Sequence, residues 1–174
     1  APGTATIEVY SGGVSTDIYV RFQAVLETET IKLNGFELRM VDSSYTYEPS
    51  NELKVDIGAE SQLQQTGYTL MSNDDTTFYE LNNVRVRIAR ENGDSGVLLS
   101  NSYLQNHDQV DLLRDGAYRN GGIRLRFSNL PQGSYQLITY HHNPDSAVQS
   151  SMNIYVNDSV RINQLIASDA LVSA

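Results

Sequence analysis

Hydrophobic and polar residues alternate along most of the chain with the period of two that is typical of β-strands. The alternating segments are rich in Val, Ile, Tyr and Thr, which suit a pleated, half-buried surface. The predicted strands lie at 4–10, 17–26, 30–41, 51–58, 84–91, 97–104, 122–130, 135–142 and 150–158. The pattern therefore predicts an all-β protein.

Turn residues separate these segments. The Asn-Gly pair within 91–96 favours a hairpin, and Pro131 with Gly133 favours a tight β-turn. Helical spacing is weak, because the best candidate, 109–118, contains Gly116 and would end after a turn or two. Many short strands joined by turns predict an antiparallel β-sandwich of the jelly-roll type.

The segment 42–50 is polar and interrupts the alternation, so it is the best candidate boundary. The strands before it are too few to bury a core alone. We therefore expect residues 1–174 to form one domain, in which residues 1–41 supply strands that complete the sandwich of residues 51–174.

Charge and composition exclude several classes of partner. The net charge is −9 and the isoelectric point is near 4.6, which argues against a nucleic-acid partner. No apolar run is long enough for membrane insertion, and the first residues do not form a signal segment, so a secreted protein would be present here in mature form. Lysine occurs only at positions 32 and 54, so ten of the twelve cations are arginines, which favour bidentate contacts.

The segment 112–158 contains an Arg-Asp loop, an alternating strand, a Leu-Pro-x-Gly-x-Tyr turn, a Thr-Tyr-His-His strand and one further strand. In this order it resembles the malectin-like and related jelly-roll modules of secreted polysaccharide-degrading enzymes, many from marine bacteria. The resemblance extends over about residues 45–158. It implies a non-catalytic carbohydrate-binding module.

The strand order differs from that family in one respect. The phrase "KLNGFELRM" at 32–40 precedes the segment that it would be expected to follow. Either the chain begins within one repeat of a tandem array, or it is a circular permutant, with 42–50 as the boundary in both schemes.

The first candidate ligand subsite lies in the strand 135–142. Alternation sends His141 to the predicted buried face and His142 to the opposite face with Tyr140. A ring and nearby polar groups suit a sugar, so Tyr140, His142 and Asn143 form a candidate subsite at the rim. In the alternative interpretation both histidines are structural hydrogen-bonding groups.

The loop before strand 122–130 is the preferred second rim. Arg114, Asp115, Tyr118 and Arg119 provide donors, an acceptor and a ring for a glycan, and neighbouring glycines allow close approach of a ligand. In the alternative, Arg114 and Asp115 only hold the loop against the sandwich.

Two strands carry arginines in alternation with apolar residues. Arg85 and Arg87 share one face, as do Arg124 and Arg126, and such rows could bind the sulfate or carboxylate groups of an anionic polysaccharide. The competing interpretation is a solvated face paired with some of the chain's 21 carboxylates.

Motifs for metals and catalysis are missing or weak. Jelly-roll modules often carry a structural calcium ion, for which this sequence offers oxygen donors at Asp74 and Asp75, at Asp108 with Asp111, or at Asn157 and Asp158, each of which equally fits a turn. Three histidines without metal-binding spacing predict no zinc site, and cysteine is absent. Nucleophile-elbow, Walker and dinucleotide motifs are absent from the sequence.

The resemblance to malectin-like modules therefore implies an extracellular module, not an enzyme, that binds a polysaccharide and targets an attached catalytic domain. With the supply of arginines, it also implies a marine galactan such as agarose or porphyran as the ligand class. Two alternatives stay open: a jelly-roll polysaccharide lyase that uses Tyr140, His142 and Arg126, and a structural or adhesive cell-surface repeat.

Overall fold

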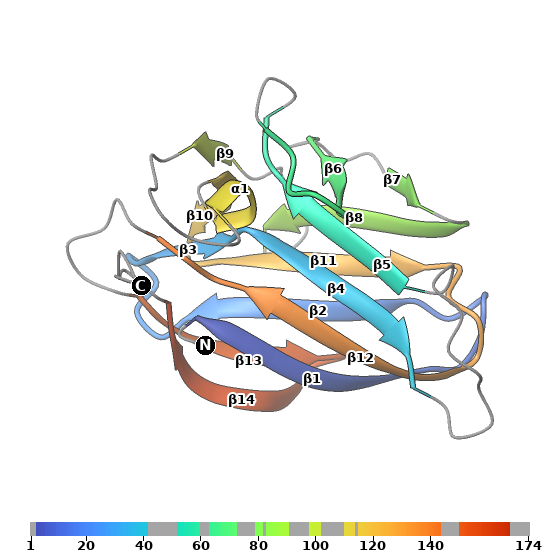
Figure 1. Ribbon diagram of the computed structural model, residues 1–174. Coiled ribbons are helices and arrows are strands. Elements are labelled where there is room, and N and C mark those ends of the chain that lie inside the picture. The colour runs from blue at the N-terminus through green and yellow to red at the C-terminus, as the bar shows by residue number, and fades with distance from the viewer. Residues whose placement is uncertain are drawn as a thin grey trace.

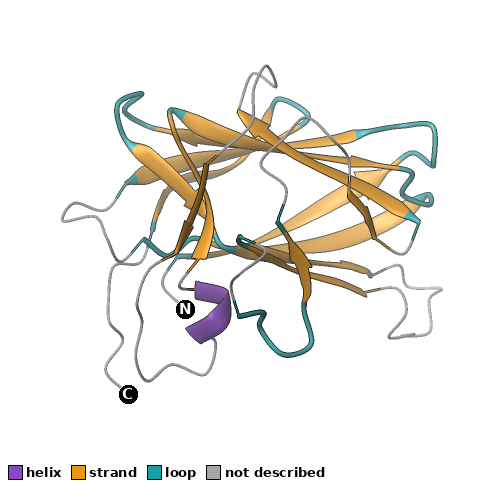
Figure 2. Cartoon of the chain, turned by 90° about the horizontal axis from the view of Figure 1, so that it is seen from above, coloured by secondary structure: helices purple, strands orange, loops and turns teal. Residues whose placement is uncertain are grey.

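The computed structural model describes residues 3–41, 52–59, 63–72, 79–81, 83–90, 98–101, 110–113, 115–143 and 150–167. Within these ranges the chain is almost entirely β, with three sheets, none of which is closed. Figure 1 shows the strands, and Figure 2 shows from above that most of them form two layers. The predicted all-β class is confirmed.

One layer is a five-stranded sheet. In spatial order its strands are β1 (Thr4–Ser11), β12 (Gly133–Tyr140), β4 (Gly35–Met40), β5 (Glu52–Ile57) and β6 (Thr69–Met71). Neighbours are antiparallel except β5 and β6, which are parallel. Strands from the beginning of the chain therefore lie on both sides of β12.

The other layer is a six-stranded antiparallel sheet. In spatial order its strands are β14 (Ser159–Ile166), β13 (Ser151–Val156), β2 (Ile18–Ala24), β11 (Gly122–Ser128), β8 (Val84–Arg90) and β7 (Tyr79–Leu81). Here β2 is hydrogen-bonded to β11 and β13. The first forty residues are thus built into both layers.

A third, three-stranded sheet lies at one end of the molecule (Figure 1). Its order is β3 (Thr30–Leu33), β10 (Asp115–Asn120) and β9 (Leu98–Asn101), and the one-turn helix α1 (Val110–Leu113) precedes β10. The segment predicted as one strand at 30–41 is divided at Asn34, so that β3 and β4 belong to different sheets.

The core lies between the two large sheets and follows from the alternation. In β2, Ile18, Val20 and Phe22 are fully buried, and the residues between them are not. The rings of Phe36 from β4 and Phe127 from β11 meet edge to face at 5.4 Å between centroids. Such contacts join the layers and make each sheet a rigid platform for its outer face.

Each of the nine predicted strands is present in the structure, and four strands were not predicted. The missed strands are β6, β7, β10 and β14. Of these, β6 and β7 are only three residues long. In the predicted helical segment 109–118 only Val110–Leu113 is helical, as α1, and residues 115–118 already belong to β10. Strand β10 escapes the pattern because it contains Gly116, at a φ of 154°, where a Cβ would lie 2.7 Å from the Leu33 carbonyl oxygen. The predicted boundary 42–50 lies outside the described residues.

Candidate functional site

The outer side of the six-stranded sheet carries an unusual set of side chains. Burial of alternate residues in β2 turns Tyr19 and Arg21 outward, and the same alternation operates in β8, β11 and β13. We define the arginine–tyrosine face as the outward side chains Tyr19, Arg21, Arg85, Arg87, Arg124, Arg126 and Tyr155.

Arginines on adjacent strands of this face stand directly opposite one another. Arg124 of β11 is the register partner of Arg21 of β2, and Arg126 is the partner of Arg87 of β8. Like charges directly opposite on one face of an antiparallel pair destabilise the sheet. The repulsion between these arginines must therefore be offset by rings or carboxylates close to the guanidinium groups.

The tyrosine rings supply part of that compensation. The guanidinium carbon of Arg21 lies 4.2 Å from the centroid of the Tyr155 ring. Arg124 and Arg126 both lie over Tyr19, at 4.8 and 5.4 Å from its centroid. Cation–π attraction at these distances stabilises the guanidinium groups by about 0.5–1 kcal/mol at an exposed site.

Asp17, just before β2, neutralises Arg126. The Nε–H of Arg126 donates to Asp17 Oδ2 at 2.7 Å, and Nη2 lies 2.5 Å from the same oxygen. Burial raises the pKa of Asp17, but hydrogen bonds from Arg126 and Ser128 and the charges of Arg126 and Arg85 outweigh it, so this pKa lies below its ordinary value. Asp17 is therefore ionised at neutral pH and fixes the position of Arg126.

Arg21 and Arg124 are compensated far less. The nearest carboxylate to Arg21 is Asp158, whose Oδ1 lies 3.9 Å from Nη2, beyond hydrogen-bonding distance, and whose side chain is 97% exposed. The Nε–H of Arg21 has no hydrogen-bond acceptor in the described structure. No carboxylate of the described residues lies within ion-pair distance of Arg124. The centre of the face therefore has two guanidinium groups and one carboxylate, Asp158, at the limit of ion-pair distance from Arg21.

The turn between β13 and β14 closes one side of this centre. Asn157 and Asp158 have φ of 46° and 65°, as a tight hairpin turn with the twist of the strands requires. Asn157 Oδ1 accepts a hydrogen bond from the backbone N–H of Tyr19 at 2.9 Å, and the backbone N–H of Asn157 donates to the Tyr19 carbonyl at 2.9 Å. The turn is therefore fixed to β2.

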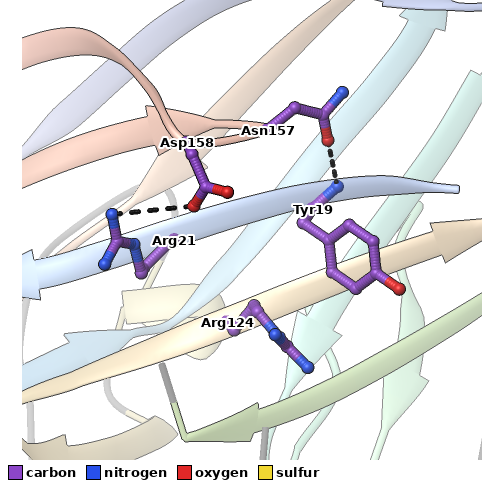
Figure 3. Close-up of a pocket in the computed structure, with 5 residues that line it drawn as sticks. All are labelled: Tyr19, Arg21, Arg124, Asn157 and Asp158. Carbon is purple, nitrogen blue, oxygen red and sulfur yellow. Dashed lines mark hydrogen bonds and ion pairs between the residues drawn. The ribbon is translucent and has the colours of Figure 1, made fainter. Parts of the chain in front are cut away.

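Together these side chains surround a pocket of about 300 Å³. It is lined by Tyr19, Arg21, Arg124, Asn157 and Asp158, which Figure 3 shows on three neighbouring segments. The pocket combines cationic donors, a carboxylate and a phenol ring. That chemistry suits a ligand with both an anionic group and hydroxyl groups.

Comparison with family models, curated proteins and solved structures found no match for this chain. The pocket therefore has to be interpreted from its own chemistry. In the described ranges no helix is long and apolar enough to cross a membrane, and no three His, Asp or Glu side chains gather as a metal site.

The subsite predicted at the end of β12 is buried. Tyr140 is 9% exposed, and its hydroxyl donates to Glu37 Oε1 at 2.8 Å, while the Tyr68 hydroxyl donates to the same oxygen. Burial and these hydrogen bonds raise the pKa of Tyr68 well above its usual range. Leu112 of α1 packs against both tyrosines on the outer side of the five-stranded sheet, so the Tyr140 ring does not offer an open stacking face.

His142 and Asn143 are also buried, at 3% and 9% exposure, so His142 does not occupy the expected rim. His141 is fully buried, as predicted for its face, and its ring nitrogens bond Lys32 O at 2.8 Å and Thr139 Oγ1 at 2.9 Å. Burial lowers the pKa of His141 to about 4, although the bond to Lys32 acts in the opposite direction. His141 is therefore neutral inside the protein at pH 7.

Asn34 connects this segment to the second predicted rim. Its Nδ2 donates to Leu113 O at 2.9 Å and Asp115 O at 2.6 Å, and its Oδ1 accepts from the His142 amide at 2.5 Å. The backbone N–H of Asn34 donates to the backbone carbonyl of Tyr140 at 2.9 Å. We define the Asn34 junction as Asn34 with these four partners. The junction joins the two predicted subsites as a buried structural contact.

The other predicted rim residues lie on β10 or outside the described ranges. Asp115 is fully buried, whereas Tyr118 and Arg119 are partly buried opposite Lys32 and Ile31 of β3. Arg114 lies outside the described residues. The structure therefore brings Asp115 close to His142 through Asn34. Tyr118 and Arg119 lie further along β10, where they pair with β3 and do not join this contact.

The residues proposed for a lyase are not brought together. Tyr140 lies on the outer side of the five-stranded sheet, and His142 is buried at its end. Arg126 lies on the outer side of the other sheet, bound to Asp17. An acid, a base and a neutralising arginine must share one cleft, and these three do not.

The arginine rows are the part of the face that the sequence predicted. The two rows lie side by side, because β8 and β11 are hydrogen-bonded neighbours in register. Sequence reasoning missed Tyr19, Arg21 and Tyr155, although the alternation of "IYVRF" contains the signal. Asn157 and Asp158 form a turn; the calcium candidates at 74–75 and 108 lie outside the described residues.

Proposed function

We propose that the protein is a non-catalytic carbohydrate-binding module that recognises an extracellular polysaccharide through the arginine–tyrosine face. The observation that carries this proposal is the incompletely neutralised centre of that face, where Arg21 and Arg124 stand opposite each other beside an open pocket and only Asp158 lies within ion-pair distance. Cationic donors, a ring and exposed oxygen atoms together match a polymer that bears hydroxyl and anionic groups.

The charge distribution supports a specific anionic partner. The chain has a net charge of −9, so most of its surface repels polyanions. The arginine–tyrosine face instead groups five arginines, of which Arg126 is ion-paired with Asp17 and Arg21 with Asp158. A concentrated positive patch on an acidic protein favours binding in one place rather than along the whole surface.

The sheet also provides rigidity. The strand β2 is hydrogen-bonded on both sides, and the turn at Asn157 is fixed to Tyr19. A ligand therefore meets a backbone whose position is set before binding, which reduces the ordering cost of association.

Several finer features belong to the same proposal. We infer a jelly-roll sandwich, a fold with which the two large sheets are compatible. The protein acts outside the cell beside an attached catalytic domain, and its ligand is a marine galactan such as agarose or porphyran. These features follow from the resemblance of residues 45–158 to malectin-like modules.

Affinity electrophoresis in native gels that contain different polysaccharides tests the proposal. We expect retardation by at least one extracellular polysaccharide, and loss of retardation in Arg21→Ala and Arg124→Ala. The control is Arg39→Ala, which removes the same charge from the other sheet. Arg39 lies on the outer side of the five-stranded sheet, where its Nε–H donates to Gln136 Oε1 at 2.8 Å. Unchanged mobility of the wild-type protein across a panel of neutral, sulfated, uronate and phosphorylated polymers would overturn it.

A further inference from the structure

The pocket of the arginine–tyrosine face has a feature that points to a particular anion. Arg21 and Arg124 approach it from adjacent strands, which lie about 4.8 Å apart in any sheet. One anion between them must accept hydrogen bonds from two guanidinium groups in different directions. The geometry of its oxygen atoms therefore decides which anion fits.

We propose that this pocket binds a sulfate half-ester of a sulfated polysaccharide, held between Arg21 and Arg124. This inference rests on the proposed function and specifies its ligand. A sulfate half-ester has three terminal oxygens arranged around sulfur, so it bonds both guanidinium groups at once. A carboxylate has two coplanar oxygens, so it offers fewer acceptor directions than the three oxygens of a sulfate ester.

Neither guanidinium group has a hydrogen-bond acceptor among the described residues. Arg21 has its nearest carboxylate, Asp158, at 3.9 Å and a buried Nε–H, so its terminal nitrogens are the donors that remain, and Arg124 lies over the Tyr19 ring with no carboxylate of the described residues within ion-pair distance. The neighbouring Arg126 differs, because Asp17 already accepts its hydrogen bond at 2.7 Å. The anionic group is therefore directed to the Arg21–Arg124 pair rather than to the whole row.

The remaining pocket residues suit the sugar that carries the sulfate. Asp158 is 97% exposed and can accept hydrogen bonds from sugar hydroxyl groups, and the Tyr19 ring lines the same pocket. Asp158 also places a negative charge close to the anion. That charge disfavours a doubly charged phosphate monoester more than a singly charged sulfate ester, since repulsion grows with the charge of the ligand.

Four polymers in native gels separate these possibilities: a sulfated galactan, the same galactan after chemical desulfation, a uronate polymer and a phosphorylated mannan. We expect the sulfated galactan to bind at least about tenfold more tightly than the desulfated one, because one charge-assisted anion contact is lost. Stronger binding of the uronate or the phosphorylated polymer would overturn the assignment to sulfate.

Variants at Arg124 give a second, independent readout by titration calorimetry with the sulfated galactan. Arg124→Gln should weaken binding about 10- to 100-fold, and Arg124→Lys, which keeps the charge but loses the planar fork, should recover only part of it. Arg39→Gln is the matched control and should bind like the wild type. Wild-type affinity in Arg124→Gln would overturn the inference.

The two proposals fail differently. Equal affinity for the sulfated and desulfated galactans overturns the sulfate inference and leaves the polysaccharide-binding function standing. Absence of binding to all four polymers overturns the proposed function itself, and the sulfate inference with it.

Discussion

The Asn34 junction and the arginine–tyrosine face both gather polar side chains, but they differ in how completely those groups are paired. At the junction, the side-chain amide and carbonyl of Asn34 are both bonded within 2.9 Å, and Asn34 is fully buried. At the face, Arg21 and Arg124 are opposed like charges without a close anion. Satisfied polar groups stabilise a fold, whereas unsatisfied donors on an open surface are available to a ligand.

The largest expected effect is at the junction. Asn34→Ala removes three side-chain hydrogen bonds and leaves buried backbone groups without partners, so the free energy of unfolding should fall by about 3–5 kcal/mol. Urea denaturation measures the change. The control is Asn120→Ala, which removes one exposed bond from Thr30 and should cost less than about 1 kcal/mol. Equal losses in the two variants would contradict the structural role of Asn34.

The next effect depends on pH. The pKa of His141 falls from 6.5 in the unfolded chain to about 4 in the folded protein, so the unfolded state binds a proton more readily. The stability that neutral His141 supplies is complete above pH 6.5 and is lost as pH falls from 6.5 to 4, by about 3 kcal/mol in total. Urea denaturation at a series of pH values should show this decrease, and a much flatter dependence in His141→Gln. A profile that is unchanged by the substitution would rule out His141 as its source.

A smaller effect separates the predicted tyrosine subsite from the face. Tyr140→Phe removes the hydrogen bond to Glu37 and should lower the free energy of unfolding by about 1 kcal/mol. Binding of the sulfated galactan should not change, because the Tyr140 ring is covered by Leu112 and Tyr68. Calorimetric titration of the variant checks this, and weaker binding would return Tyr140 to the ligand site.

The smallest expected change in stability accompanies the largest change in binding. Arg124→Gln loses a cation–π contact with Tyr19 and also removes a like-charge opposition with Arg21, and the two contributions are of similar size. The free energy of unfolding should therefore change by less than about 0.5 kcal/mol while affinity for the sulfated galactan falls. Thermal unfolding followed by circular dichroism measures the first quantity, and a loss of several kcal/mol would make Arg124 structural.

Individual strands show which features of the fold the alternation of the sequence could predict. The alternation in β2, β8 and β11 was sufficient to predict strands and to place Arg85 with Arg87 and Arg124 with Arg126. It did not predict β14, whose residues are mostly exposed and are held by pairing with β13. It also did not divide 30–41 at Asn34, because the break is caused by partners far away in the chain.

The sequence by itself determined the all-β class, the core-facing side of strands with clear alternation such as β2 and β11, and the shared faces of the arginine rows, because these depend on the local period of two. Only the tertiary structure decided that Arg21 stands opposite Arg124 and that Tyr140 and His142 are buried. The reason is that register between strands and burial of a strand end are set by contacts between segments distant in the chain. A local pattern contains no information on which segment will cover a given side chain.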